Sequence, residues 1–417
     1  MTATVSADET VTATGRSTTT LPALDSMRAV AAVAVIATHA SFWGGAYAQP
    51  AIGTALARLD IGVAIFFVLS GFLLSGPWFE RHAGRLPPPP TGRYLWKRAL
   101  RIIPVYVLAA VAALVLLPGN SGASPALWVK TLLLSNIYVD DHLPDGLTQM
   151  WSLAVEVAFY VLLPGIMWLA LSRRRRGTPS RSRLGVVLAV LVAVNVVWVL
   201  DLAVRLDWGG SMIGLWLPSY LTWFSVGMAM AACYVRVHRE AQDATVGSDR
   251  VASILRQMGM APGVCWTTGL ALFAISATPV AGPSSLTAPA LGEAMTKNLL
   301  YAVTAGLLIL PAVFADPGGR FIRVMSTPLL RHLGHISYGL FCVHLVILEL
   351  VARWRGIELF EGRTVELFAL TLVLSLVVSE VLYRLVERPA MLLRNLGRSS
   401  RVRSTDSKTP KAAATRR

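Results

Sequence analysis

The stretch LDSMRAVAAVAVIATHA, residues 24–40, decides the fold class of this chain. It is almost entirely apolar, yet it carries Arg28 and His39 within its length. A helix needs about twenty consecutive apolar residues to cross a hydrocarbon core of ~30 Å. Inside lipid the backbone must also satisfy its own hydrogen bonds, which a helix does. The stretch therefore predicts a membrane-spanning helix that buries two ionisable side chains.

Similar apolar runs recur along the whole chain of 417 residues. Hydrophobic residues make up 54% of it and charged residues only 15%, and the mean hydropathy is +0.58. A soluble chain of this length would need more polar surface to cover its core. The pattern predicts an all-α polytopic membrane protein with about ten transmembrane helices. The expected spans are 24–44, 60–79, 102–118, 151–171, 185–204, 214–234, 263–279, 297–315, 334–352 and 365–386.

The positive charges gather on one side of this predicted bundle. Of the 38 Lys and Arg residues, 28 lie in the loops after the even-numbered spans, including the run 173–176, and in the C-terminal tail. The positive-inside rule therefore places both termini in the cytoplasm, with the spans in the cell membrane. This placement argues against a nucleic-acid partner for the net charge of +15 and favours contact with lipid headgroups.

The two ends of the chain lack the apolar pattern. Residues 1–20 have no basic segment followed by an apolar one, so we expect a disordered cytoplasmic leader and not a cleaved signal. Residues 391–417 predict a basic, disordered cytoplasmic tail, which leaves 21–390 as one membrane domain. No disulfide framework or metal site is expected, because the three cysteines are scattered and odd in number and no His/Cys spacing suggests ligands. The cysteines are Cys233, Cys265 and Cys342.

Arg28 and His39 share one face of the first predicted helix. They are eleven residues apart, so at ~100° per residue they are nearly aligned and about 16 Å apart along the axis. Ionisable groups inside an apolar span cost several kcal/mol unless they are paired or hydrated, which makes each a functional candidate. A long donor could place its charged part at Arg28 and its reactive end at His39. A snorkelling arginine beside a buried, satisfied histidine is the alternative.

Two further groups of ionisable residues are candidates. Glu156 lies near the start of the fourth span, at an expected depth similar to that of His39, where a carboxylate could orient an imidazole and raise its basicity. A structural ion pair is the alternative for Glu156. Arg98 and Arg101 are i, i+3 neighbours at the cytoplasmic start of the third span, a spacing that suits phosphate recognition. A purely topogenic role is their alternative.

The ninth span and the end of the tenth carry polar side chains as well. Tyr338 can hydrogen-bond between helices. His344 is expected near the midplane, where a structural role is weighed against a catalytic one. Glu380 is expected to pair with Arg384 at i, i+4.

Six short stretches, taken in order along nearly the whole chain, resemble the acyltransferase-3 family of bacterial multi-pass membrane acyltransferases. Each stretch alone is a weak signal, but six in the family's order together with ten predicted spans are specific. The stretches are LDSMRAVAAVAVIATHA (24–40), IFFVLSGFLLS (65–75), YLWKRALRIIPVY (94–106), WSLAVEVAFY (151–160), LGHISYGLFCVH (333–344) and YRLVERP (383–389).

The resemblance implies a reaction and places it on numbered residues. An acyl group, usually acetyl, would pass from a cytoplasmic acyl-CoA to a hydroxyl of a sugar or similar acceptor, with acyl-CoA (acetyl-CoA) as co-substrate and no bound cofactor. Many members have a second acidic residue where this chain has Val157, so the acidic role rests on Glu156 alone. The matching positions are Arg28 and His39 for the family's Arg-(ten residues)-His pair, Arg98 and Arg101 for its basic motif, and Trp151, Ser152 and Glu156 for its WSLxVE motif.

The leading hypothesis is a membrane-bound O-acyltransferase. His39 would take the proton from the acceptor hydroxyl, and Glu156 would hold His39. A covalent acyl-enzyme on His39 or Ser70 stays open. The acceptor stays open too: an envelope polysaccharide, peptidoglycan, a lipid-linked sugar or a glycosylated metabolite. The candidate donor- and substrate-binding residues are Arg28, Arg98, Arg101, Ser70, Trp151, Tyr338 and His344.

Two hypotheses from other classes compete with this one. A transporter or flippase for a glycolipid or small molecule would also use intramembrane charges, but we see no duplicated halves of the kind that transporters show. A scaffold or assembly protein would leave the shared face of Arg28 and His39 unexplained.

Overall fold

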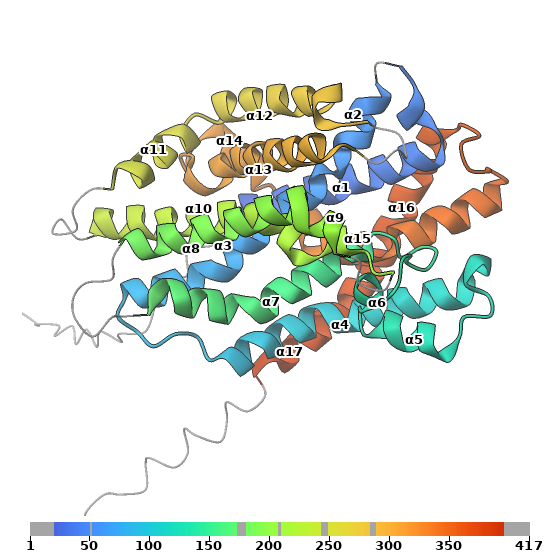
Figure 1. Ribbon diagram of the computed structural model, residues 1–417, viewed down its shortest axis with the longest axis horizontal. Helices are drawn as coiled ribbons and strands as arrows, with labels where there is room; N and C mark the ends of the chain where they lie inside the picture. Colours follow the sequence, from blue (N-terminus) through green and yellow to red (C-terminus); the bar gives the residue numbers. More distant parts are fainter. Residues whose placement is uncertain are drawn as a thin grey trace, which may run out of the picture.

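The computed structural model describes residues 21–50, 52–172, 181–206, 210–242, 249–283 and 289–395. Within these ranges the chain forms helices and no β-strand, so the all-α prediction is confirmed. The long helices run roughly along one axis, back and forth between two ends of the molecule, with α5 and α6 at one end and α11 at the other (Figure 1).

Each of the ten predicted spans falls on a helix, in chain order. Short helices connect them: α2 (Gly53–Ala57), α5 (Pro125–Leu132), α6 (Asn136–Val139), α9 (Ala203–Arg205), α11 (Arg250–Gly259), α14 (Arg320–Met325) and α17 (Arg388–Leu392). The long helices are α1 (Ala23–Trp43), α3 (Ile61–Ala83), α4 (Thr91–Leu116), α7 (Met150–Leu171), α8 (Arg181–Val197), α10 (Leu221–Gln242), α12 (Pro262–Ser276), α13 (Leu291–Phe314), α15 (Pro328–Arg355) and α16 (Thr364–Leu382).

The number of membrane crossings is lower than ten when length and apolar composition are the criteria. In the described part of the chain eight helices qualify, or nine if α11 and α12, which meet at an 89° bend, form one span. The 15 residues of α12 reach only about 22 Å by themselves, less than the ~30 Å core. The helix α10 does not qualify, and its C-terminal part carries polar side chains such as Arg236, His238 and Arg239.

Three of the predicted features fall on or beyond the limits of the described residues. The leader 1–20 and the arginine run 173–176 lie outside them, as does the tail after Asn395. The chain is still helical from 391 to 395, in the end of α17 and the turn η9 (Leu393–Asn395), so helix continues past the predicted start of the tail.

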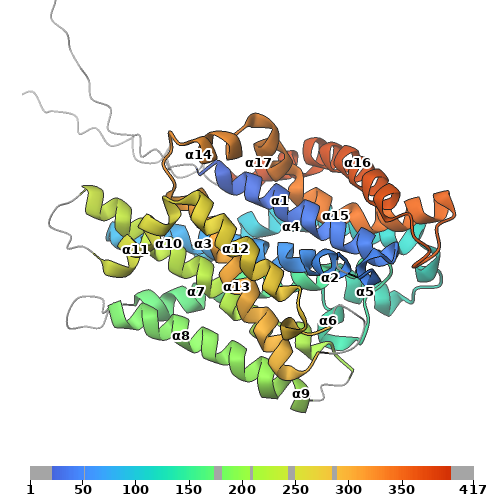
Figure 2. The same ribbon diagram turned by 90° about the horizontal axis from the view of Figure 1, so that it is seen from above.

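Close backbone contacts hold the central helices together. A Cβ atom added at Gly227 of α10 would lie 2.0 Å from the carbonyl oxygen of Val68 in α3, and one at Gly71 of α3 would lie 2.2 Å from that of Phe224. Small residues allow helix backbones to approach this closely inside a membrane. The helices α8 and α16 lie on opposite flanks of the bundle (Figure 2), and most of their apolar surface is left for lipid.

The helix α7 begins inside the molecule and not at its surface. Gln149, the residue before it, is 3% exposed, and its Nε2 donates to the carbonyl of Cys342 at 3.2 Å. Cys342 lies halfway along the 28 residues of α15. The segment that leads into α7 is held by Asn120, whose side chain exchanges hydrogen bonds of 3.0 and 3.1 Å with the backbone of Asp145. Non-helical backbone at such depth is tolerated where protein surrounds it.

Candidate active site

A cavity with an empty volume of about 800 Å³ lies between α1, α3, α4, α7 and α15. Its mixture of apolar walls and a few polar groups is typical of small-molecule sites. The apolar walls include Phe66, Phe67 and Phe341. The polar side chains that line it are Arg28, Ser70, Arg98, Arg101, Ser152, Glu156, Tyr160, Ser337 and Tyr338.

The three arginines singled out from the sequence meet in this cavity. Arg28 comes from the second turn of α1, and its Nη1 lies 2.8 Å from Asp25 Oδ1. Arg101 comes from α4, and its Nη1 lies 2.9 Å from Oε1 of Glu387, whose side chain is only 1% exposed. A carboxylate that does not line the cavity thus orients each of these two guanidinium groups. Their remaining N–H groups are left for a ligand in the cavity.

Arg98 is held differently from the other two arginines. Its Cζ lies 6.0 Å from the centroid of the Tyr160 ring, a cation–π distance. Its Nε is buried and has no hydrogen-bond partner among the described residues. The guanidinium of Arg98 is thus the cavity cation with the most unused hydrogen-bonding capacity.

Glu156 is also in this cavity, where it binds a hydroxyl. Ser70 Oγ of α3 donates a hydrogen bond to Glu156 Oε1. Tyr160, one turn further along α7, also lines the cavity. Tyr338 completes this wall, and its hydroxyl donates to the carbonyl of Ile102 at 2.8 Å.

The expected pairing of Glu156 with His39 is not formed among the described residues. The expectation took α7 to begin at the membrane surface, whereas α7 begins halfway along α15 through Gln149. Glu156 is seven residues further on, about 10 Å deeper along the helix. It therefore reaches the cavity that holds Arg28, and His39 does not line that cavity.

His39 pairs with His344 instead. The Nε2 of His344 lies 3.2 Å from Nδ1 of His39, and the two ring centroids are 5.1 Å apart. Neither histidine lines the cavity. The Phe341 ring lines the cavity and also packs near the pair, with its centroid 5.9 Å from that of His344. Phe66 packs edge-on against Phe341 at 6.0 Å.

The remaining candidate, Trp151, does not line the cavity and packs against two aromatic rings. Its ring centroid is 5.0 Å from that of Tyr220 and 6.4 Å from that of Phe67. Because Phe67 itself lines the cavity, Trp151 supports the wall and does not reach the space within it.

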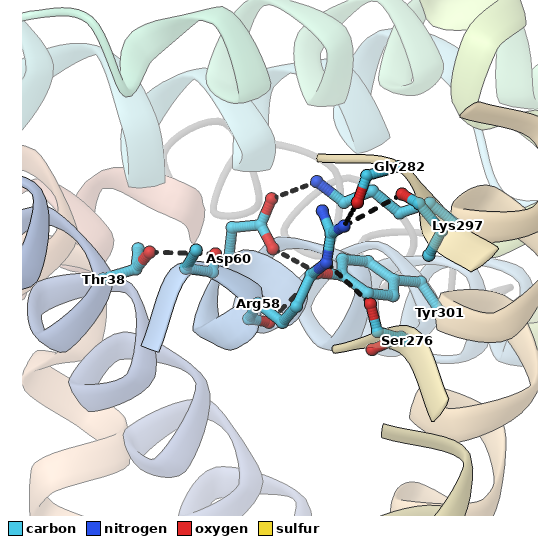
Figure 3. A network of polar contacts seen from close by, with 9 residues as sticks. Thr38, Arg58, Asp60, Ser276, Gly282, Lys297 and Tyr301 are labelled. Atoms are coloured by element: carbon cyan, nitrogen blue, oxygen red, sulfur yellow. Dashed lines mark hydrogen bonds and ion pairs between the residues drawn. The ribbon is translucent and has the colours of Figure 1, made fainter. Parts of the chain in front are cut away.

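A polar network near His39 fixes the end of α1 to its neighbours (Figure 3). Thr38, next to His39 in the chain, donates to the carbonyl of Ala57 at 3.1 Å. Arg58 is buried, and its guanidinium donates to three backbone carbonyls: that of Ser276 at the end of α12, and those of Ala281 and Gly282 in the segment that follows. Asp60 accepts from Tyr301 and pairs with Lys297 at 2.7 Å. All these charges are satisfied internally, so the network is structural.

Several residues of the site were not identified as candidates from the sequence. Tyr160 and Glu387 both lie in stretches that match the family, and Glu387 is a carboxylate at the end of an apolar span, which was the available signal. Nothing in the sequence marked Gln149. The predicted pair of Arg384 and Glu380 is confirmed, at 2.5 Å. In the described ranges no three His, Cys, Asp or Glu side chains gather as metal ligands.

Comparison with known proteins gives relatives along most of the chain. Acyltransferase MdmB of Streptomyces mycarofaciens is 28% identical over 411 residues, which cover 91% of this chain and 93% of that protein. Exopolysaccharide production protein ExoZ of Rhizobium meliloti is 27% identical over 359 residues, which cover 82% and 91%. Peptidoglycan O-acetyltransferase OatA of Listeria monocytogenes is 32% identical over 167 residues, which cover 35% and 24%.

No solved structure matches the chain. Residues 21–384 match the sequence model of the family described as "Acyltransferase domain". This match covers the membrane helices and every candidate site residue except Glu387. The chain therefore belongs to the acyltransferase-3 family, and it is a multi-pass membrane acyltransferase.

Proposed function

We propose that this enzyme transfers an acyl group, acetyl in the simplest case, from acyl-CoA to a hydroxyl group of a sugar-containing acceptor. The observation that carries the proposal is the convergence of Arg28, Arg98 and Arg101 on one cavity that also holds Glu156. Asp25 and Glu387 hold Arg28 and Arg101 from outside the cavity lining, so the three guanidinium groups and the Glu156 carboxylate are the charged groups that line the cavity itself. Guanidinium groups bind phosphate oxygens through paired charged hydrogen bonds, as a CoA donor requires.

The donor would enter from the cytoplasmic side. Arg28 lies in the second turn of α1, and Arg98 and Arg101 lie within the first eleven residues of α4. Both helices begin at the same end of the bundle as α11. The positive-inside distribution of charge supports a cytoplasmic location for that end, and with it for both termini in the cell membrane. The thioester would then point along the cavity toward Phe66 and Phe341, beyond which His39 lies.

His39 would act as the general base. The acceptor oxygen forms a bond to the thioester carbonyl carbon while Nε2 of His39 takes the hydroxyl proton. The carbon–sulfur bond then breaks, and the proton passes to the CoA thiolate. General base catalysis contributes about 10²–10⁴-fold to such a step. Because Ser70 donates to Glu156 in the donor cavity, these two residues would position the donor and not the base.

A glycan hydroxyl is the acceptor that the relatives support. One relative is named for exopolysaccharide production and another is named a peptidoglycan O-acetyltransferase. We therefore propose an envelope glycan, a lipid-linked sugar or a glycosylated metabolite as the acceptor class.

The test is transfer of radiolabelled acetyl from acetyl-CoA by the purified protein in proteoliposomes. Glycan and metabolite fractions from a deletion strain would serve as acceptors, and mass spectrometry would identify the fraction that gains acetyl groups. We expect His39→Ala to lower turnover by about 10²–10⁴-fold without loss of the folded protein. His332→Ala is the control, since His332 is exposed on α15 and pairs with Glu380 away from the cavity. Near-normal transfer by His39→Ala would overturn the mechanism, and substrate movement without acetyl-CoA consumption would favour a transporter.

A further inference from the structure

The pair formed by His39 and His344 has a defined geometry. His39 belongs to α1 and is half-buried, whereas His344 belongs to α15 and is fully buried. Besides the 3.2 Å contact between them, each ring has one backbone partner at 2.8 Å: the carbonyl of Val35 for Nδ1 of His39, and the carbonyl of Phe341 for Nδ1 of His344.

These partners determine where the ring protons sit. A backbone carbonyl only accepts hydrogen bonds, so each Nδ1 must carry a hydrogen. In the neutral rings both Nε2 atoms then hold a lone pair. The lone pair of His344 Nε2 faces the Nδ1–H of His39, which is shared between two acceptors. The Nε2 of His39 has no hydrogen-bond partner among the described residues, so its lone pair is available to a substrate.

We infer that His344 is a positioning residue that holds His39 in the tautomer with a basic Nε2 and accepts from Nδ1–H when His39 becomes protonated. The inference rests on the proposed function, because it needs His39 to act as the base. In hydrolases this position behind a catalytic histidine is held by a buried carboxylate. Here a neutral imidazole fills it, and the nearby carboxylate of Glu156 is engaged by Ser70 in the cavity.

A matched pair of substitutions separates this role from simple packing. In His344→Gln the amide oxygen can sit where Nε2 was and accept from His39. In His344→Asn the shorter side chain reaches only the position of Nδ1. Both variants are polar and similar in size, so a packing role predicts similar defects in the two.

We expect His344→Asn to lower kcat by about 10²-fold, the lower end of a general base contribution, while KM for acetyl-CoA stays at the wild-type value. His344→Gln should recover most of that loss. His332→Ala on the same helix should leave kcat unchanged. Equal kcat losses in the Gln and Asn variants, or a rise of the KM for acetyl-CoA in both, would overturn the inference.

Nitrogen-15 NMR of histidine-labelled protein tests the same inference. The measurement is made on the wild-type protein, so unfolding by a substitution cannot affect the result. The His39 signals, assigned by their loss in His39→Gln, should show a protonated Nδ1 and an unprotonated Nε2. The opposite tautomer in the wild type would overturn the inference. If His39→Ala retains transfer, the proposed function is wrong. If His39→Ala abolishes transfer but His344→Asn retains the full kcat, the proposed function stands and the role of His344 is wrong.

Discussion

Arg98 is the cavity arginine whose contribution to binding is simplest to isolate. Unlike Arg28 and Arg101, it has no carboxylate partner among the described residues, so its removal leaves no buried acid unpaired. A hydrogen bond to a charged group contributes about 1.5–3 kcal/mol, which corresponds to roughly tenfold or more in affinity. Its loss should therefore appear in donor binding and not in stability.

We predict that Arg98→Gln raises KM for acetyl-CoA by about tenfold or more and leaves KM for the acceptor unchanged. Steady-state kinetics with either substrate varied would show the difference. Arg93→Gln is the matched control, because Arg93 is exposed at the start of the same helix and does not line the cavity. An equal rise of both KM values would speak against a donor site at Arg98.

At the scale of the elements, the depth at which a helix begins decides which side chains meet. Helical periodicity was sufficient to predict that Arg98 and Arg101 share a face, and both do line one cavity. It was not sufficient for Glu156, because hydropathy gives the length of an apolar run but not the depth of its first residue. The bond from Gln149 to α15 joins residues far apart in the chain, so no local pattern reports it.

Gln149→Leu should therefore disturb catalysis from outside the cavity. The substitution removes the hydrogen bond from Gln149 to the Cys342 carbonyl, with a cost of about 0.5–1.5 kcal/mol for one hydrogen bond. Because α7 would no longer be anchored, we expect Glu156 to shift and kcat/KM for acetyl-CoA to fall. Gln49→Leu, at an exposed loop position, is the control. Unchanged kcat/KM in a folded Gln149→Leu protein would contradict this account.

The contact between α3 and α10 gives a prediction about stability. In Gly227→Ala the new Cβ would lie 2.0 Å from the Val68 carbonyl, so the two backbones must separate. Overpacking of this kind costs about 1–3 kcal/mol, and we expect a lower melting temperature in detergent. Gly185→Ala on α8 has open space around its Cβ and should melt like the wild type. The prediction is wrong if the two variants melt together.

The molecule as a whole separates two faces of the membrane, and its orientation is testable directly. Gly92 lies at the start of α4, and Ser121 lies in the turn before α5, at the opposite end. Gly92 has no other atom within 4 Å of an added Cβ, and Ser121 is exposed, so a cysteine fits at both. In a variant without the three native cysteines, we predict that intact cells label Ser121→Cys with an impermeant maleimide. Gly92→Cys should react only after the cells are opened. The reverse pattern would invert the proposed orientation.

The all-α fold and the order of its helices were predictable from the sequence, since lipid permits little else for such runs. The number of membrane crossings was less predictable, since eight or nine helices of the described residues qualify as spans and ten were predicted. The helix α10 owes its place to close packing on α3, at Gly227 and Gly71, and not to an apolar composition that a hydropathy pattern could report.

The contact between Phe66 and Phe341 also bears on the electrical insulation of the cell. Both rings line the cavity, and they pack edge-on with their centroids 6.0 Å apart. His344 follows Phe341 by one helical turn, about 5 Å along α15. If acyl-CoA binds to the arginines as proposed, an uncharged acyl group would have to pass these rings while the phosphates stay behind. The same two rings would then keep ions from following the acyl group across the membrane.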